Sequence, residues 1–200
     1  NMTPPLLSIS RSDLSERGEL RSRLGIPTEA NVALVSLGAG EINDIGSLRD
    51  HVVESLVERG VYVVIADSML KPMRKKFEHE MVRVVQKFPI MKNRGCFDFA
   101  VIAAGYNSVN ECILLRLPAV IFPNSETSRD DQPGRAEKAS EIGGAIVVES
   151  ADKGLVGLAM DRICDDDVRA EMAQRLVMNY ADDGADSLAE NLISAVQNSS

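Results

Sequence analysis

The residues best suited to bind a ligand lie between Phe99 and Glu111, in the sequence Phe-Ala-Val-Ile-Ala-Ala-Gly-Tyr-Asn-Ser-Val-Asn-Glu. The apolar run 99–103 predicts a buried strand, Gly105 predicts a tight turn, and Asn107 is expected to begin a helix. A strand that enters a helix through a small-residue turn leaves backbone N–H groups without partners at the start of the helix. Such a turn favours an anion, most often a phosphate.

Each polar residue of this turn also has a purely structural interpretation. Asn107 and Ser108 are good helix caps, although Ser108 could instead donate its hydroxyl to a phosphate oxygen. Glu111 falls in the first helical turn, where the helix dipole favours a carboxylate in any case. It could also accept hydrogen bonds from a ribose diol. Composition alone favours the structural interpretations.

Two further polar loops follow predicted strands, and both are expected at the same edge of the sheet because ligands bind at the carboxyl ends of parallel strands. Gly38-Ala39-Gly40 is about equally well explained as a flexible turn or as a loop approaching phosphates. A dinucleotide fingerprint would place a third glycine where Asn43 stands, which disfavours a nicotinamide cofactor.

The second loop, 124–132, contains Asp130, Asp131 and Gln132. Their side chains could make several hydrogen bonds to sugar hydroxyls. Without other evidence, a solvated polar loop is the favoured interpretation.

Apolar runs and helical patterns alternate along the chain, which predicts an α/β fold. We expect a single Rossmann-like, doubly wound parallel sheet of about six strands, with extra C-terminal helices. Residues 1–30 are expected to be a linker or lead-in, and residues 31–200 the ligand-binding domain. Predicted strands are 32–37, 61–66, 81–85, 99–103, 118–122 and 145–148, and predicted helices are 12–24, 47–60, 72–80, 107–115 and 135–141, followed by a helical region over 152–197.

Composition narrows the possible partners. The net charge of −8 disfavours a nucleic acid or an anionic membrane surface. The three cysteines match neither a disulfide framework nor a zinc motif, so we expect free thiols in a reducing, cytoplasmic location. No run is long enough to span a membrane. His51 and His79 are expected within helices and without a partnering cysteine or carboxylate cluster, and the acidic run 165–167 is better explained as a helix cap, so no metal site is predicted.

The segment 97–148 resembles the donor-binding half of GT-B glycosyltransferases, most closely the family that contains the bacterial lipid-linked N-acetylglucosaminyltransferase MurG. The plant UDP-glycosyltransferase signature is similar over the same stretch. The matching positions are Gly105, Tyr106-Asn107-Ser108, Glu111, Pro123, Asp131-Gln132 and Arg135-Ala136. Two positions depart from the pattern. Ala103 stands where the plant signature has a His, and Arg116-Leu117 precede Pro118 where the family usually has a Gly that ends a helix.

The resemblance implies a nucleotide-sugar site, with a UDP-sugar as the expected ligand, that requires no metal and no cofactor. The family pattern implies five groups of contacts. The diphosphate would lie on Ala104, Gly105, Tyr106, Asn107 and Ser108, with Gly38, Ala39 and Gly40 opposite; Glu111 would hold the ribose, Asp131 and Gln132 the sugar, and Phe88, Ile90 and Met91 would edge the base.

The catalytic residue is unknown, because GT-B enzymes usually supply the base from an N-terminal acceptor domain. The chain opens with Asn1-Met2 and has strands for one sheet, so we expect a donor-binding piece of a longer enzyme, or a subunit whose acceptor domain is a separate chain. Membrane association is expected only through that partner. There are two alternatives. One is a sugar-nucleotide hydrolase or epimerase. The other is a non-catalytic subunit that binds a partner through an apolar patch at Leu176, Leu188, Leu192 and Ile193.

Overall fold

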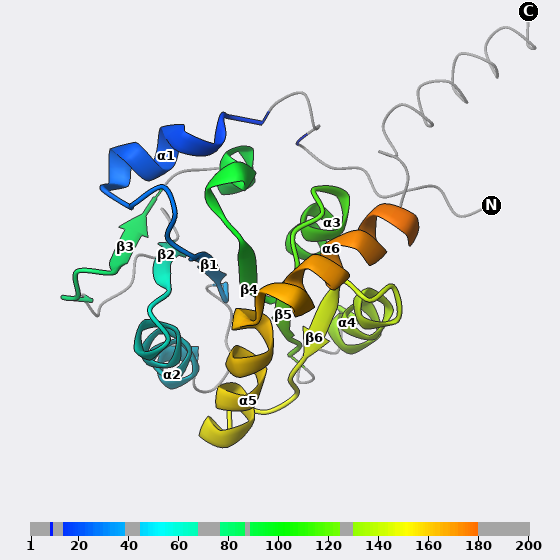
Figure 1. The fold of residues 1–200 in the computed structure, drawn as a ribbon. Coiled ribbons are helices and arrows are strands. Elements are labelled where there is room, and N and C mark those ends of the chain that lie inside the picture. Colours follow the sequence, from blue (N-terminus) through cyan, green and yellow to red (C-terminus); the bar gives the residue numbers. More distant parts are fainter. Residues whose placement is uncertain are drawn as a thin grey trace, which may run out of the picture.

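The structure, a computed structural model, describes residue 9 and residues 14–38, 45–67, 77–86, 89–124 and 130–179. Strands and helices alternate along it as the apolar periodicity predicts (Figure 1). The strands are β1 (Val32–Ser36), β2 (Tyr62–Ala66), β3 (Val82–Val85), β4 (Phe99–Ala103), β5 (Ala119–Phe122) and β6 (Ala145–Val147). The helices are α1 (Arg17–Leu24), α2 (Ile45–Glu58), the 3₁₀ segment η2 (Ile90–Cys96), α3 (Tyr106–Leu114), α4 (Gln132–Glu141), α5 (Lys153–Cys164) and α6 (Asp166–Asn179).

The six strands form one parallel sheet in the order β3-β2-β1-β4-β5-β6. This confirms the predicted Rossmann-like, doubly wound sheet. Each central strand is a continuous apolar run because both faces of the sheet are covered. The chain reverses its direction of travel across the sheet between β1 and β4, so a crevice is expected at the carboxyl ends of these two strands.

The core has two layers, one on each face of the sheet. Side chains of α2 and α5, which lie against each other, pack on one face together with Val35 and Val101. Residues of α1, η2, α3 and α4 pack on the other face with Leu34 and Ile102. Helix α6 reaches both layers, because Met172 belongs to the first and Leu176 to the second.

The part of the predicted lead-in that the structure describes is packed onto the domain. Leu20 and Ile26 belong to the core, and α1 lies against η2. Arg21, only 2% exposed, donates to the carbonyls of Cys96, Thr28 and Ala30 and pairs with Asp98 at 2.9 Å. Asp98 also accepts a hydrogen bond from the Val32 N–H. Helix α1, whose sequence is polar with few apolar positions, therefore packs against the domain near the amino end of β1.

Several predicted boundaries change. Residues 77–80 are not helical, although a helix was expected over 72–80, and the rest of that helix lies outside the described residues. Helix α4 begins at Gln132 rather than at Arg135, because the Asp131 carboxylate caps it by accepting from the Gly134 N–H at 3.0 Å. The Asp165 carboxylate caps α6 in the same way, as predicted for the acidic run.

Leu176 is buried in the core, so its proposed place in an exposed apolar patch is wrong. Leu188, Leu192 and Ile193 lie outside the described residues. None of the described helices combines the length and the apolar character needed to cross a membrane.

Candidate functional site

The first turn of α3 offers backbone donors at the carboxyl end of β4. Gly105 is the N-cap residue with extended backbone angles, and no side chain caps the helix. The first helical hydrogen bond runs from the Val109 N–H to the Gly105 carbonyl at 3.1 Å. The N–H groups of Tyr106, Asn107 and Ser108 therefore have no acceptor within the helix.

The capping role considered for Asn107 and Ser108 is wrong. The helix begins one residue earlier than its sequence indicates, so both residues lie inside its first turn. The uncapped turn keeps the positive end of the helix dipole available to an anion.

A cavity of about 190 Å³ opens beside this turn, at the point where the strand order reverses. It contains five residues that the sequence placed in the site: Ile90, Met91, Asn107, Ser108 and Glu111. Five others were not expected there. The complete lining is Leu34, Ser36, Pro89, Ile90, Met91, Ile102, Asn107, Ser108, Glu111 and Cys112.

Glu111 is the one carboxylate in this lining. Burial raises the pKa of its side chain from 4.5 to about 6. Burial also raises the pKa of the neighbouring Cys112 thiol to about 12, and the charge of Glu111 adds to that increase. Cys112 is therefore a neutral thiol, whereas Glu111 is a half-buried carboxylate that can ionise near neutral pH and accept hydrogen bonds from a ligand.

Arg135 connects the α3 turn to α4, although the sequence gave it no role in the site. Its guanidinium donates to the Ala104 carbonyl, pairs with Asp130 at 2.5 Å, and lies 5.7 Å from the centre of the Tyr106 ring. The hydrogen bond from Arg135 is the main reason that the pKa of Asp130 is lowered. Arg135 is a position of the family pattern and follows an acid by five residues, but neither signal reveals the contact with Ala104.

The Asp131–Gln132 pair lies outside the cavity lining. The Asp131 carboxylate caps α4. The side-chain Oε1 of Gln132 accepts from the Asn124 N–H at 3.0 Å. Both side chains thus hold the connection between β5 and α4. Ala104 is fully buried behind the turn.

The remaining predicted site residues lie either outside the cavity lining or outside the described residues. Gly38 follows β1 with a φ of 76° and is not part of the lining, whereas Ala39, Gly40 and Phe88 lie outside the described residues. In the described parts of the chain, no three His, Cys, Asp or Glu side chains gather closely enough to hold a metal ion.

Comparison with known proteins finds sequences and folds similar to this chain among glycosyltransferases. No family model matches the chain. Over 185 residues it is 27% identical to the UDP-N-acetylglucosamine--N-acetylmuramyl-(pentapeptide) pyrophosphoryl-undecaprenol N-acetylglucosamine transferase of Salinibacter ruber. That match covers 86% of this chain and 49% of the relative.

Solved structures with a similar fold are also glycosyltransferases. The glycotransferase of kitacinnamycin matches with a TM-score of 0.67 and 20% identity, over 96% of this chain and 49% of its own. Spinosyn rhamnosyltransferase SpnG, complexed with thymidine diphosphate, matches with a TM-score of 0.67 and 19% identity, over 82% and 45%. Glycosyltransferase VinC, in complex with dTDP, matches with a TM-score of 0.65 and 18% identity, over 88% and 44%.

The chain therefore has the fold of a GT-B glycosyltransferase domain. It spans about half the length of the relatives that it matches. Its most informative likeness in sequence is to a transferase named for N-acetylglucosamine transfer from a UDP-linked donor.

Proposed function

We propose that this chain is the donor-binding half of a glycosyltransferase and binds a nucleotide sugar, most suitably a UDP-sugar, for transfer of a hexosyl group. The observation that carries the proposal is one cavity that combines the uncapped start of α3 with the half-buried Glu111. The names of the relatives support it, since one refers to a UDP-linked sugar and two are complexes with thymidine diphosphate or dTDP.

The proposed contacts follow the geometry of the cavity. The diphosphate lies at the first turn of α3 and accepts from its backbone N–H groups and from the Ser108 hydroxyl. Glu111, one helical turn further on, accepts from the two ribose hydroxyls. Ile90 and Met91 of η2 edge the base, while the Gly38 loop approaches the phosphates from β1.

The sugar extends from the diphosphate toward the start of α4. Asp131 and Gln132 are proposed to read its hydroxyls with the acceptor capacity that their structural hydrogen bonds leave unused. The Arg135 bridge to Ala104 keeps this end of α4 next to the phosphate turn.

The proposed reaction is an inverting displacement. An acceptor hydroxyl forms a bond to the anomeric carbon as the bond from that carbon to the phosphate oxygen breaks. The helix N-terminus stabilises the negative charge that develops on the departing diphosphate. The acceptor proton passes to a base on the acceptor-binding half, which we place in an N-terminal domain or a separate chain because this chain spans about half of its relatives. A cytoplasmic location and membrane association through that half stay predictions.

Calorimetric titration of the 200-residue chain with UDP and UDP-N-acetylglucosamine tests the proposal. We expect saturable binding that weakens several-fold in Ser108→Ala, which removes a phosphate donor. Asn110→Ala is the matched control, because Asn110 lies on the same helix, outside the cavity, with its amide on the Tyr106 carbonyl. A folded chain that binds neither ligand at millimolar concentration would overturn the proposal.

A further inference from the structure

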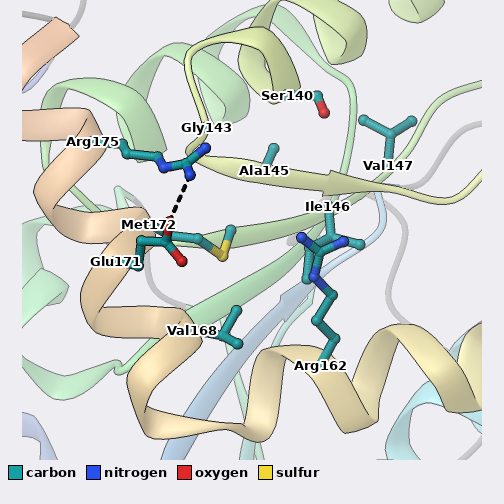
Figure 2. Close-up of a pocket in the computed structure, with 10 residues that line it drawn as sticks. All are labelled: Ser140, Gly143, Ala145, Ile146, Val147, Arg162, Val168, Glu171, Met172 and Arg175. Atoms are coloured by element: carbon teal, nitrogen blue, oxygen red, sulfur yellow. Dashed lines mark hydrogen bonds and ion pairs between the residues drawn. The ribbon is translucent and has the colours of Figure 1, made fainter.

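A second cavity, of about 300 Å³, lies at the β6 edge of the sheet and shares no lining residue with the nucleotide cavity. Its walls are β6, α5, α6 and the end of α4 with the loop that follows it (Figure 2). Ile146, Val168 and Met172 supply apolar lining, whereas Arg162, Glu171 and Arg175 supply charged groups. The complete lining is Ser140, Gly143, Ala145, Ile146, Val147, Arg162, Val168, Glu171, Met172 and Arg175.

Strand β6 ends the sheet, so one side of its backbone has no neighbouring strand among the described residues. The Gly144 carbonyl accepts from Ala119, and the Val148 N–H donates to Ile121, so these groups face β5. Backbone groups alternate in direction along a strand. The N–H and carbonyl groups of Ala145 and Val147 therefore face the open edge.

Although β6 is only three residues long, its edge carries neither of the residue types, charged or proline, that most often keep a further strand away. Strand β6 is Ala-Ile-Val, with neither a charged residue nor a proline. Unprotected edges of this kind accept an additional strand from another chain.

Charge at the rim favours an acidic occupant. Figure 2 shows Arg162 extending from α5 toward Ile146. Its acidic neighbours in sequence are engaged elsewhere: Asp161 pairs with Arg59 at 2.6 Å, Asp165 caps α6, and Asp166 pairs with Arg169. Within the described ranges, no acidic side chain pairs with Arg162. Arg175 pairs with Glu171 at 2.5 Å, and both remain more than half exposed.

We propose that this corner binds an extended acidic peptide segment of a partner protein, which adds to the sheet as a strand beside β6. Its backbone pairs with Ala145 and Val147, a carboxylate forms a two-point hydrogen bond with the Arg162 guanidinium, and an apolar side chain enters the cavity against Met172. A small anion could use Arg162 but would leave the strand edge and the apolar part of the cavity, at Ile146 and Met172, empty. The site is independent of the proposed donor-binding function.

The test uses the peptide acetyl-Glu-Val-Glu-Val-Glu-amide, titrated into the isotope-labelled 200-residue chain. We expect saturable NMR shifts of the Ala145 and Val147 amides, and slower hydrogen exchange at both. Arg162→Gln should weaken binding several-fold. Arg23→Gln is the matched control, because Arg23 is an exposed arginine on α1, 3.9 Å from its acidic partner and remote from this cavity.

Three outcomes would overturn the proposal. The first is the absence of saturable shifts with millimolar peptide. The second is equal binding of a peptide with lysine in place of each glutamate, which would remove the role assigned to Arg162. The third is a response near Arg162 without any change at the β6 amides, which would indicate a simple anion site. Binding of UDP in the same sample reports separately on the donor site.

Discussion

Glu111 is the residue through which pH should control the cavity beside α3, if it binds the proposed nucleotide sugar. Its carboxyl has a pKa of about 6, and the ionised form, which accepts on both oxygens, is the better partner for a ribose diol. We expect the affinity for UDP-N-acetylglucosamine, whose phosphates do not titrate in this range, to fall as the pH is lowered through that value. Glu111→Gln should bind more weakly at neutral pH and lose this pH dependence. Calorimetry across the range measures both effects, and identical pH profiles would contradict the assignment.

The same raised pKa has a consequence for stability with the opposite sign. An acid whose pKa is higher in the folded state than its ordinary 4.5 destabilises the fold once it is ionised. The penalty is absent below the ordinary pKa, grows as the pH rises to about 6, and is fully present above it. Glu111→Gln should therefore raise the melting temperature at neutral pH and leave it unchanged in acid. A variant that binds less but melts later would show that this carboxylate is kept for binding.

Arg116 occupies a conformation that suits few residues with a β-carbon. Its φ is 55°, at the position where the sequence lacks the helix-ending glycine of similar proteins. Arg116 itself therefore takes the left-handed conformation that a glycine would adopt without strain. The Leu117 N–H donates to the Cys112 carbonyl, and Arg94 holds the carbonyls of Leu115 and Arg116, so the turn closes normally around the strained residue.

Asparagine at this position should relieve the strain, because it enters the left-handed region more readily than arginine does. We expect Arg116→Asn to raise the free energy of unfolding by about 0.5–1 kcal/mol in urea titrations. Arg116→Ala is the control: it keeps a β-carbon in the strained conformation, and removes the side chain whose buried Nε has no hydrogen-bond partner. Equal stabilisation by both variants would assign the effect to the side chain instead of the backbone.

At the scale of elements, Arg135 determines how α4 sits against the turn that opens α3. Its bonds to Ala104 and Asp130 make it a positioning residue. Arg135→Leu leaves both acceptors without their donor, so we expect weaker binding of UDP-N-acetylglucosamine and shifted amide resonances at Tyr106 and Asn107. Lys138→Leu, one turn further along α4, is the matched control. Unchanged affinity in Arg135→Leu would show that the two elements hold their positions without the bridge.

Helix α6 approaches the start of β6 so closely that only glycine fits there. A β-carbon on Gly144 would overlap the Cδ2 atom of Leu176, which is buried in the core. We expect Gly144→Ala to lower the free energy of unfolding by about 1–3 kcal/mol, because α6 must shift. Gly157→Ala, in α5 with open space around it, should instead stabilise by up to about 1 kcal/mol. Thermal and urea unfolding compare the two, and equal effects would contradict the packing argument.

The elements show where sequence reasoning succeeds. The strand predicted over 99–103 matches β4 because an uninterrupted apolar run is typical of a strand buried on both faces. The start of α4 was missed by three residues, since Asp131 could equally have been a free loop carboxylate. Local pattern does not reveal which acceptor a side chain will find after the chain has folded.

Sequence reasoning also found some features of the candidate site and missed others. The family resemblance assigned Ser108, Glu111 and residues of η2 to one site, and these residues line one cavity where the strand order reverses. The family pattern includes Arg135 but gave it no role in the site, because its acceptor is a backbone carbonyl 31 positions away. Such contacts depend on tertiary geometry and leave no periodic signal.

At the scale of the whole molecule, Arg21 decides whether the segment before β1 is a linker or part of the domain. Its buried guanidinium satisfies three carbonyls and pairs with Asp98, which in turn holds the Val32 N–H. Arg21→Leu keeps a large side chain but removes the guanidinium, so the three carbonyls and Asp98 lose its hydrogen bonds in a largely buried setting. We expect the free energy of unfolding to fall by roughly 3–5 kcal/mol.

The matched control is Arg23→Leu on the same helix. The Arg23 side chain is 62% exposed, so we expect this change to lower the free energy of unfolding by less than about 1 kcal/mol. Urea unfolding of both variants measures the difference. If Arg21→Leu were as mild as its control, α1 would be an appendage, and the domain boundary predicted at residue 30 would hold energetically. A large difference would instead make residues 14–30 part of the folding unit, so that any donor-binding domain cut from a longer chain must keep α1 to fold.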